Sequence, residues 1–279
     1  MAFRFKPFTN PAGQLRNGWW VAIFMLVLAA LLFPLLIFSK ESGAEVSFVQ
    51  QAGVVLAASV ICQMLRRKPL RELLGAGGRV WPLQWLQGAG LGALLMLLPA
   101  LVLWASGLVR FTWTATSLEA WAPALLVCAG VAVSEELMFR GFAFQRLIDG
   151  LGVWPAQLLI AAYFVLTHSA TLGPAGALGY LAGANIFVAS IAFGAAYLRT
   201  RSLAMPIGIH FAANLVQGSV LGFGVSGSSQ PTAWTPALAP GLEWLTGGAF
   251  GLEASVPGFV CIVLLAAVLV LHKPSAMAP

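Results

Sequence analysis

Residues 19–38 read WWVAIFMLVLAALLFPLLIF, a run of twenty residues without a charged side chain. A helix of about 20 apolar residues spans the hydrocarbon core of a bilayer, because each residue adds about 1.5 Å. The run is too long for the apolar part of a signal peptide, and no small-residue cleavage site follows it. We therefore predict a retained transmembrane helix at this position.

The rest of the chain has the same apolar character. Hydrophobic residues make up 59% of its 279 residues and charged residues only 9%, whereas soluble domains contain about 25% charged residues. Long apolar runs predict about eight spans, at residues 19–38, 46–65, 83–105, 120–145, 153–170, 175–198, 202–222 and 257–271. The expected fold is all-α, a polytopic transmembrane helix bundle that forms a single integral membrane domain over residues 1–279. This composition excludes a nucleic-acid-binding protein and a disulfide framework.

The basic residues predict the orientation of these spans. Fifteen lysines and arginines are concentrated on alternate connections, and five of them lie between residues 66 and 79. Because positive loops remain on the cytoplasmic side, we expect both termini in the cytoplasm of a bacterial-type inner (cell) membrane. Segment 223–256 is then outside, with Glu243, Glu253 and no base.

Three of the predicted spans contain polar or charged residues at positions that would lie within the hydrocarbon core of the membrane. The segment Val133-Ser-Glu-Glu-Leu-Met-Phe-Arg140 places two acids and an arginine in the fourth run. An ionisable residue at such a depth costs at least about 2.5–3.5 kcal/mol, so each needs a reason. Glu136 and Arg140 are four residues apart and can form an ion pair, which leaves Glu135 without a partner on its own helix.

The fifth and seventh runs contribute two imidazoles and an amide. His168 lies in the fifth run, and His210 lies in the seventh with Asn214 one helical turn later. A single intramembrane histidine or asparagine is often only a hydrogen bond between helices. Together, the two acids, the arginine, the two histidines and the asparagine are six polar groups on three helices. Their number indicates one polar cavity inside the bundle.

These residues resemble the signatures of the CAAX-protease and bacteriocin-processing (CPBP or Abi) intramembrane endopeptidases. The signatures are E-E-x-x-x-R, F-x-x-x-H and H-x-x-x-N, and here they are Glu135 to Arg140, Phe164 to His168 and His210 to Asn214. Each motif is weak alone, but all three occur in order within a motif-bearing core of about 120–222. The resemblance implies that the protein cuts a peptide bond of a membrane-associated protein or peptide, next to the lipid bilayer.

Peptide hydrolysis needs a base for water, a proton for the leaving amine and donors for the oxyanion. Glu135 in an apolar pocket is the expected base, with His168 helping to hold and deprotonate the water. His210 and Asn214 are expected to donate to the oxyanion, and the resemblance implies the same roles. The residues expected to support this site are Glu136, Arg140 and Phe164.

Other interpretations remain open at this point. Glu135, His168 and His210 would also suit a catalytic zinc ion, although H-E-x-x-H is absent and a metal-free site without a cofactor is favoured. A proton-coupled transporter could relay protons through the same groups, but no clear inverted repeat is visible. A non-catalytic scaffold or immunity protein would tolerate decayed motifs. The sequence does not identify the substrate, its prenylation, the oligomeric state or the role of residues 223–256.

Overall fold

The computed structural model describes residues 7–75, 77–114 and 117–271. In chain order the elements are α1 (Asn17–Ser42), α2 (Phe48–Leu65), α3 (Arg71–Leu74), α4 (Val80–Ala105), β1 (Val109–Trp113), α5 (Leu118–Arg140), α6 (Phe142–Leu151), α7 (Val153–Thr167), α8 (Ser169–Leu172), α9 (Ala177–Thr200), α10 (Ala204–Asn214), the π-helix η1 (Leu215–Val220), β2 (Trp234–Leu238), α11 (Glu243–Thr246), the 3₁₀-helix η2 (Leu252–Ala254) and α12 (Val256–Leu271). Arg4, Lys6 and Lys273, which contribute to the predicted orientation, lie outside the described residues.

All eight predicted spans are helical. Five segments are long and apolar enough to cross a membrane by length and composition: α1, α2, α4, residues 119–151 and α9. Helices α7 and α12 are apolar but shorter, and the seventh run forms α10 followed directly by η1. The prediction of an all-α membrane helix bundle is confirmed, and the protein is an integral membrane protein.

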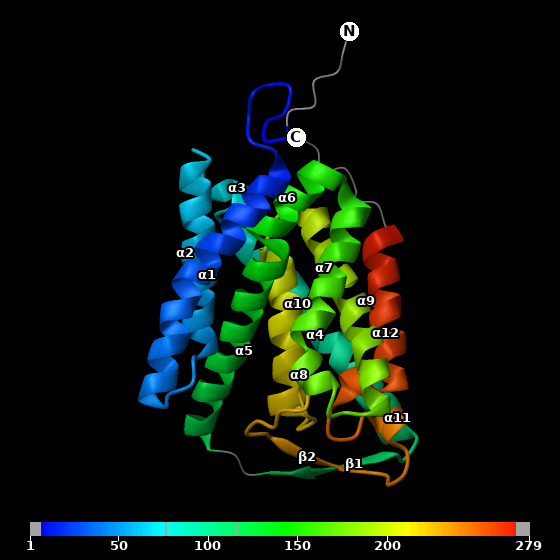
Figure 1. Ribbon diagram of the computed structural model, residues 1–279. Coiled ribbons are helices and arrows are strands. Elements are labelled where there is room, and N and C mark those ends of the chain that lie inside the picture. The colour runs from blue at the N-terminus through cyan, green and yellow to red at the C-terminus, as the bar shows by residue number, and fades with distance from the viewer. Residues whose placement is uncertain (1–6, 76, 115–116, 272–279) are drawn as a thin grey trace.

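The helices run alternately up and down, so that α1 begins and α12 ends at the same face of the bundle (Figure 1). At the opposite face β1 and β2 form a small antiparallel pair, with Val109 opposite Leu238. We call residues 221–255, which contain β2, the capping segment. The pair was not predicted, because five-residue strands are too short to stand out among apolar runs. It ties the capping segment to the end of α4.

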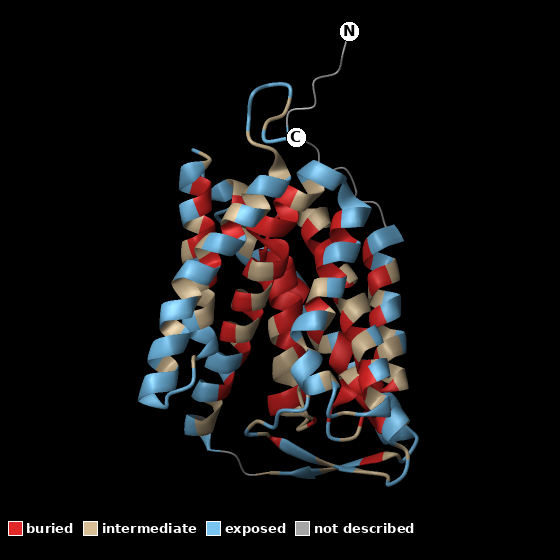
Figure 2. Ribbon diagram, viewed as in Figure 1, coloured by how far each residue is buried: buried red, intermediate tan, exposed pale blue. Residues whose placement is uncertain are grey.

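Burial is concentrated in the centre of the bundle, where α10 is buried along most of its length (Figure 2). The outward faces of the peripheral helices expose large apolar side chains: Phe33 on α1 is 65% exposed and Leu126 on α5 is 62% exposed. A soluble monomer rarely exposes so much contiguous apolar surface. These faces are therefore suited to lipid.

Helices α4 and α10 meet backbone to backbone. A Cβ atom on Gly92 of α4 would overlap the carbonyl oxygen of Ile209, and one on Gly208 of α10 would overlap the carbonyl oxygen of Trp85. Small residues allow this close approach between helices in membranes. The contact fixes the position of α10, the helix that contains two of the predicted catalytic residues.

Gly92→Ala is accordingly expected to destabilise the protein by about 1–3 kcal/mol, the usual cost of overpacking a filled contact. Gly90→Ala is the matched control, because a Cβ atom at Gly90 meets open space on the same helix. Alanine is also the better helix former there. Thermal unfolding in detergent measures both. Equal melting temperatures for the two variants would contradict the close contact.

The fourth run, predicted as a span at 120–145, lies within the candidate span 119–151, and its helix is interrupted at Gly141 inside the bundle. Helix α5 ends at Arg140, and α6 begins after Gly141 with a change of direction. Only glycine fits at this position, since a Cβ atom on Gly141 would overlap the carbonyl oxygen of Leu137. Gln145 of α6 donates to the carbonyl of Leu73 at 2.9 Å, which anchors the turn.

Arg146, which directly follows the predicted span at 120–145, is buried on α6. Its guanidinium forms ion pairs with Glu72 at 3.3 Å and with Asp149 at 3.0 Å. Glu72 also pairs with Arg66 at 3.1 Å. These ion pairs hold the connection between α2 and α4 against α6, the helix that follows the first motif.

Candidate active site

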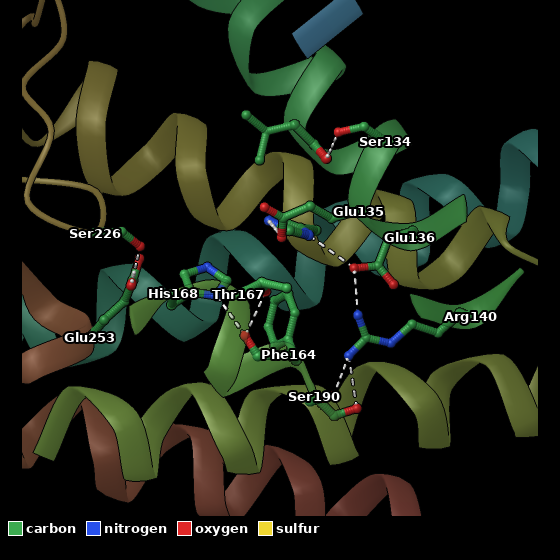
Figure 3. Close-up of polar contacts among 12 residues, drawn as sticks. Ser134, Glu135, Glu136, Arg140, Phe164, Thr167, His168, Ser190, Ser226 and Glu253 are labelled. Atoms are coloured by element: carbon green, nitrogen blue, oxygen red, sulfur yellow. Dashed lines mark hydrogen bonds and ion pairs between the residues drawn. The ribbon is translucent and has the colours of Figure 1, made fainter. Parts of the chain in front are cut away.

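A cavity of about 590 Å³ lies inside the bundle between α2, α5, α7, α9, α10 and the capping segment. Its wall includes all four predicted catalytic residues: Glu135, His168, His210 and Asn214. Three separate helical segments therefore bring their motifs to one space, as the sequence predicted. Figure 3 shows the polar contacts around this cavity.

The predicted ion pair between Glu136 and Arg140 is present and buried. Arg140 Nη1 lies 3.2 Å from Glu136 Oε1, and both side chains are about 1% exposed or less. Arg140 Nη2 donates to the carbonyl oxygen of Ser190 at 3.0 Å and to its hydroxyl at 2.8 Å (Figure 3). The guanidinium also lies over the rings of Phe164 and Phe193, at 5.1 and 5.2 Å. Arg140 thus joins α5 to α7 and α9.

His210 is held by the same carboxylate. Its Nδ1 atom lies 2.9 Å from Glu136 Oε1. Because a carboxylate paired with arginine only accepts hydrogen bonds, Nδ1 carries the proton. The other nitrogen, Nε2, lies 3.8 Å from Glu135 Oε2. From the sequence, Glu136 was expected to pair with Arg140 alone. Its contact with His210, which joins α5 to α10, was not predicted.

Glu135 has a different environment from its neighbour. Its side chain is 23% exposed, whereas that of Glu136 is fully buried. Within the described chain, Glu135 makes no hydrogen bond, and its one ionic contact is with His210. One of two adjacent acids is therefore part of the framework, and the other is open to the cavity.

His168 is the first residue after α7, which ends at Thr167. Its Nδ1 atom donates to the carbonyl oxygen of Phe164 at 2.8 Å, so Nε2 is the unprotonated nitrogen of the neutral ring (Figure 3). The imidazole also packs edge-on against the Phe164 ring at 4.7 Å. This contact explains the F-x-x-x-H spacing, because the backbone of the phenylalanine fixes the ring of the histidine.

Two asparagines present unused amides to the cavity. Asn214, the last residue of α10, makes no side-chain hydrogen bond with any described residue. Asn185 on α9 is only 5% exposed, and its buried Nδ2 atom has no hydrogen-bond partner in the part of the chain that the structure describes. Asn185 lies outside the three motifs, so the sequence analysis missed it. The sequence did contain a signal for Asn185, because an amide side chain in the middle of an apolar span is unusual.

Glu253 is the second residue that the sequence analysis missed, since it was assigned to an outside connection. In the structure it lies on η2 and lines the cavity. Its Oε1 accepts from Gln217 at 3.1 Å. Its Oε2 accepts from Ser226 at 2.8 Å (Figure 3). Burial raises the pKa of the Glu253 carboxyl, although the hydrogen bond from Ser226 and the nearby His168 act in the opposite direction.

The zinc set considered from the sequence does not assemble here. Among the residues that the structure describes, no three His, Cys, Asp or Glu side chains are placed to hold one metal ion. Glu135, His168 and His210 share the cavity wall, and each histidine uses its Nδ1 atom for a protein contact, which leaves Nε2 without a hydrogen bond to a described residue.

The fold and the cavity define a polytopic membrane protein with an acid–base site inside its helix bundle. Residues 117–216 match the family model described as Type II CAAX prenyl endopeptidase Rce1-like. The matched segment contains all three motifs and confirms the resemblance to the CAAX-protease family. It supports a CAAX-type membrane protease with a membrane-associated substrate. No curated protein matches the chain at a significant level.

Proposed function

We propose that the protein is an intramembrane endopeptidase that hydrolyses a peptide bond of a membrane-associated protein or peptide. The observation that carries the proposal is the contrast between the two adjacent acids. Glu136 is neutralised by Arg140, whereas Glu135 opens into a cavity that is also lined by two imidazoles and by several side-chain amides. A structural role alone would not require an open carboxylate in that position.

In the first step, a water molecule in the cavity is oriented by Glu135 and by the free Nε2 atom of His168. Glu135 removes a proton from the water, and the oxygen bonds to the carbonyl carbon of the peptide. His168 is fixed by the Phe164 carbonyl, so its lone pair is available to the water. The water oxygen needs no other activation in this scheme.

In the second step, the carbonyl oxygen becomes an oxyanion. The amide of Asn214 donates to it, and His210 donates through Nε2 when the ring carries two protons. The Glu136 carboxylate, which lies 2.9 Å from Nδ1, stabilises that positive ring. The tetrahedral intermediate then collapses. The bond between carbon and nitrogen breaks as the proton held by Glu135 passes to the leaving amine.

Asn214→Ala is expected to lower the cleavage rate by about 10²–10³-fold with little change in substrate binding, because one oxyanion donor is lost. A kinetic series with metal content measured on each variant tests this role. If His210 were a zinc ligand instead, His210→Ala would remove metal and Asn214→Ala would be milder. Cleavage by Asn214→Ala at the wild-type rate would contradict the oxyanion assignment.

We also propose a single membrane domain with both termini in the cytoplasm of a bacterial-type inner membrane. The first and last helical spans have their outer ends on one face, and the basic connection at α3 lies on that same face (Figure 1). A chain that crosses the membrane an even number of times has both termini on the same side. Positive charge then favours the cytoplasmic side for this face.

The substrate itself can be found by comparing proteins in membranes that contain the wild type or Glu135→Gln. Termini that are present with the wild type and absent with the variant identify cleaved proteins. The same comparison separates a protease from a scaffold or transporter, since neither of these would generate new termini.

A further inference from the structure

The cavity contains acidic groups without matching bases. Glu135 and Glu253 both line it, and no lysine or arginine of the described chain does so. Arg140 is fully buried and is already held by Glu136 and Ser190. These two acids would repel a substrate group with negative charge and attract a positive group.

Among the described residues, the groups that donate hydrogen bonds to Glu253 are neutral, and the positive charge that acts on it comes from the histidines of the same cavity. Each of its carboxylate oxygens accepts one hydrogen bond, from the amide of Gln217 or the hydroxyl of Ser226, and no ion pair joins it to a described residue. A carboxylate oxygen can accept about two hydrogen bonds, so capacity remains on both. A charge removed from water is costly unless it is paired. The described residues thus hold the Glu253 carboxyl group in place, but none of their lysines or arginines forms an ion pair with it.

Asn185 is an independent sign of a ligand in the same cavity. Its buried Nδ2 atom has no partner among the described residues, and a donor left unmet in a buried position is destabilising. The natural acceptor for such an amide is a peptide carbonyl. The cavity therefore offers a donor for a substrate backbone and a carboxylate for a substrate side chain.

We propose that Glu253 forms a subsite for a basic side chain of the substrate, lysine or arginine, and that Asn185 donates to a backbone carbonyl of the same segment. The inference rests on the proposed peptidase function and narrows its substrates to segments with positive charge near the cleaved bond. No lysine or arginine of the described residues lines the cavity to pair with a free carboxylate at the end of a substrate.

Binding tests the subsite without cleavage. The full-length protein carrying Glu135→Gln is titrated with labelled peptides, acetylated and amidated at their ends, that differ only by lysine, norleucine or glutamate at one scanned position. The lysine peptide is expected to bind at least about tenfold more tightly than the norleucine peptide, as for a desolvated charge pair. Adding Glu253→Gln should remove this preference, and adding Asn185→Ala should weaken all three peptides alike.

Glu243→Gln is the matched control, because it removes the same charge from an exposed position in the same capping segment. Adding it to the Glu135→Gln protein should leave the lysine preference unchanged. Blocked peptide ends ensure that the preference comes from the side chain and not from a terminal amine. No preference for lysine, or the same preference after Glu253→Gln, would overturn the subsite.

Cleavage by the protein with Glu135 intact distinguishes this inference from the proposed function. The ratio of kcat/KM for lysine and norleucine peptides should fall with Glu253→Gln, and Glu253→Lys should shift the preference toward the glutamate peptide. Peptides that are cut with an unchanged ratio contradict the subsite and support the peptidase. A lysine preference in binding that depends on Glu253, without cleavage of any peptide by the wild type, supports the subsite and contradicts the peptidase.

Discussion

Glu135→Gln is expected to lower peptide cleavage by about 10²–10⁴-fold, the usual loss when a positioned general base is removed. Glutamine has nearly the same shape but cannot take a proton from water. The side chain makes no hydrogen bond within the described residues, so the substitution breaks no framework contact. Expression and melting temperature should therefore remain close to those of the wild type. Single-turnover cleavage of a defined peptide measures the rate.

The control for this prediction is Glu119→Gln, which removes a carboxylate from the exposed start of the same helix. It should cleave at the wild-type rate. If Glu135→Gln also retained that rate, the open carboxylate would not be the base, and the structural interpretation of both acids would be favoured.

Arg140→Leu has the second large expected effect, on folding rather than on chemistry. Removing one partner of a buried ion pair costs about 3–5 kcal/mol, because the other charge is left uncompensated. Here the loss would leave Glu136 facing only His210, and it would also free the carbonyl and hydroxyl of Ser190. We expect a strongly reduced melting temperature or failure to accumulate in the membrane.

The double variant Glu136→Leu/Arg140→Leu separates charge from packing. Replacing both partners by apolar residues removes the uncompensated charge, so part of the lost stability should return. Cleavage should stay low, because His210 loses the carboxylate that fixes its Nδ1 atom. A double variant less stable than Arg140→Leu alone would show that the charge is not the cause.

The course of the helices could be predicted from apolar runs, because lipid requires long uncharged segments with satisfied backbones. Breaks within a run were less visible. The residue that follows α5 must be glycine, because the carbonyl oxygen of Leu137 occupies the space of a side chain at Gly141. This close contact exists only in the folded turn. The pairing of β1 with β2 joins residues far apart in sequence, and no periodicity in either segment signals it.

The motif residues of the site could be predicted because each polar side chain in a lipid-spanning run is conspicuous. The contacts between motifs could not, since they depend on how helices pack. The bond from His210 to Glu136 joins α10 to α5, and it changes which nitrogen of the imidazole is free. Glu253 was missed for another reason: it follows a long connection, where an acid ordinarily faces water.

The glycine contact between α4 and α10 also determines which part of the chain can stand alone. Family matching covers residues 117–216, yet α4 lies before that segment and α12, which packs on α9, lies after it. A fragment trimmed to the matched segment would expose the backbone around Gly208 and lose the helix that holds His210 in place. The segment that the family model matches is thus smaller than the part of this protein whose packing holds the proposed site together.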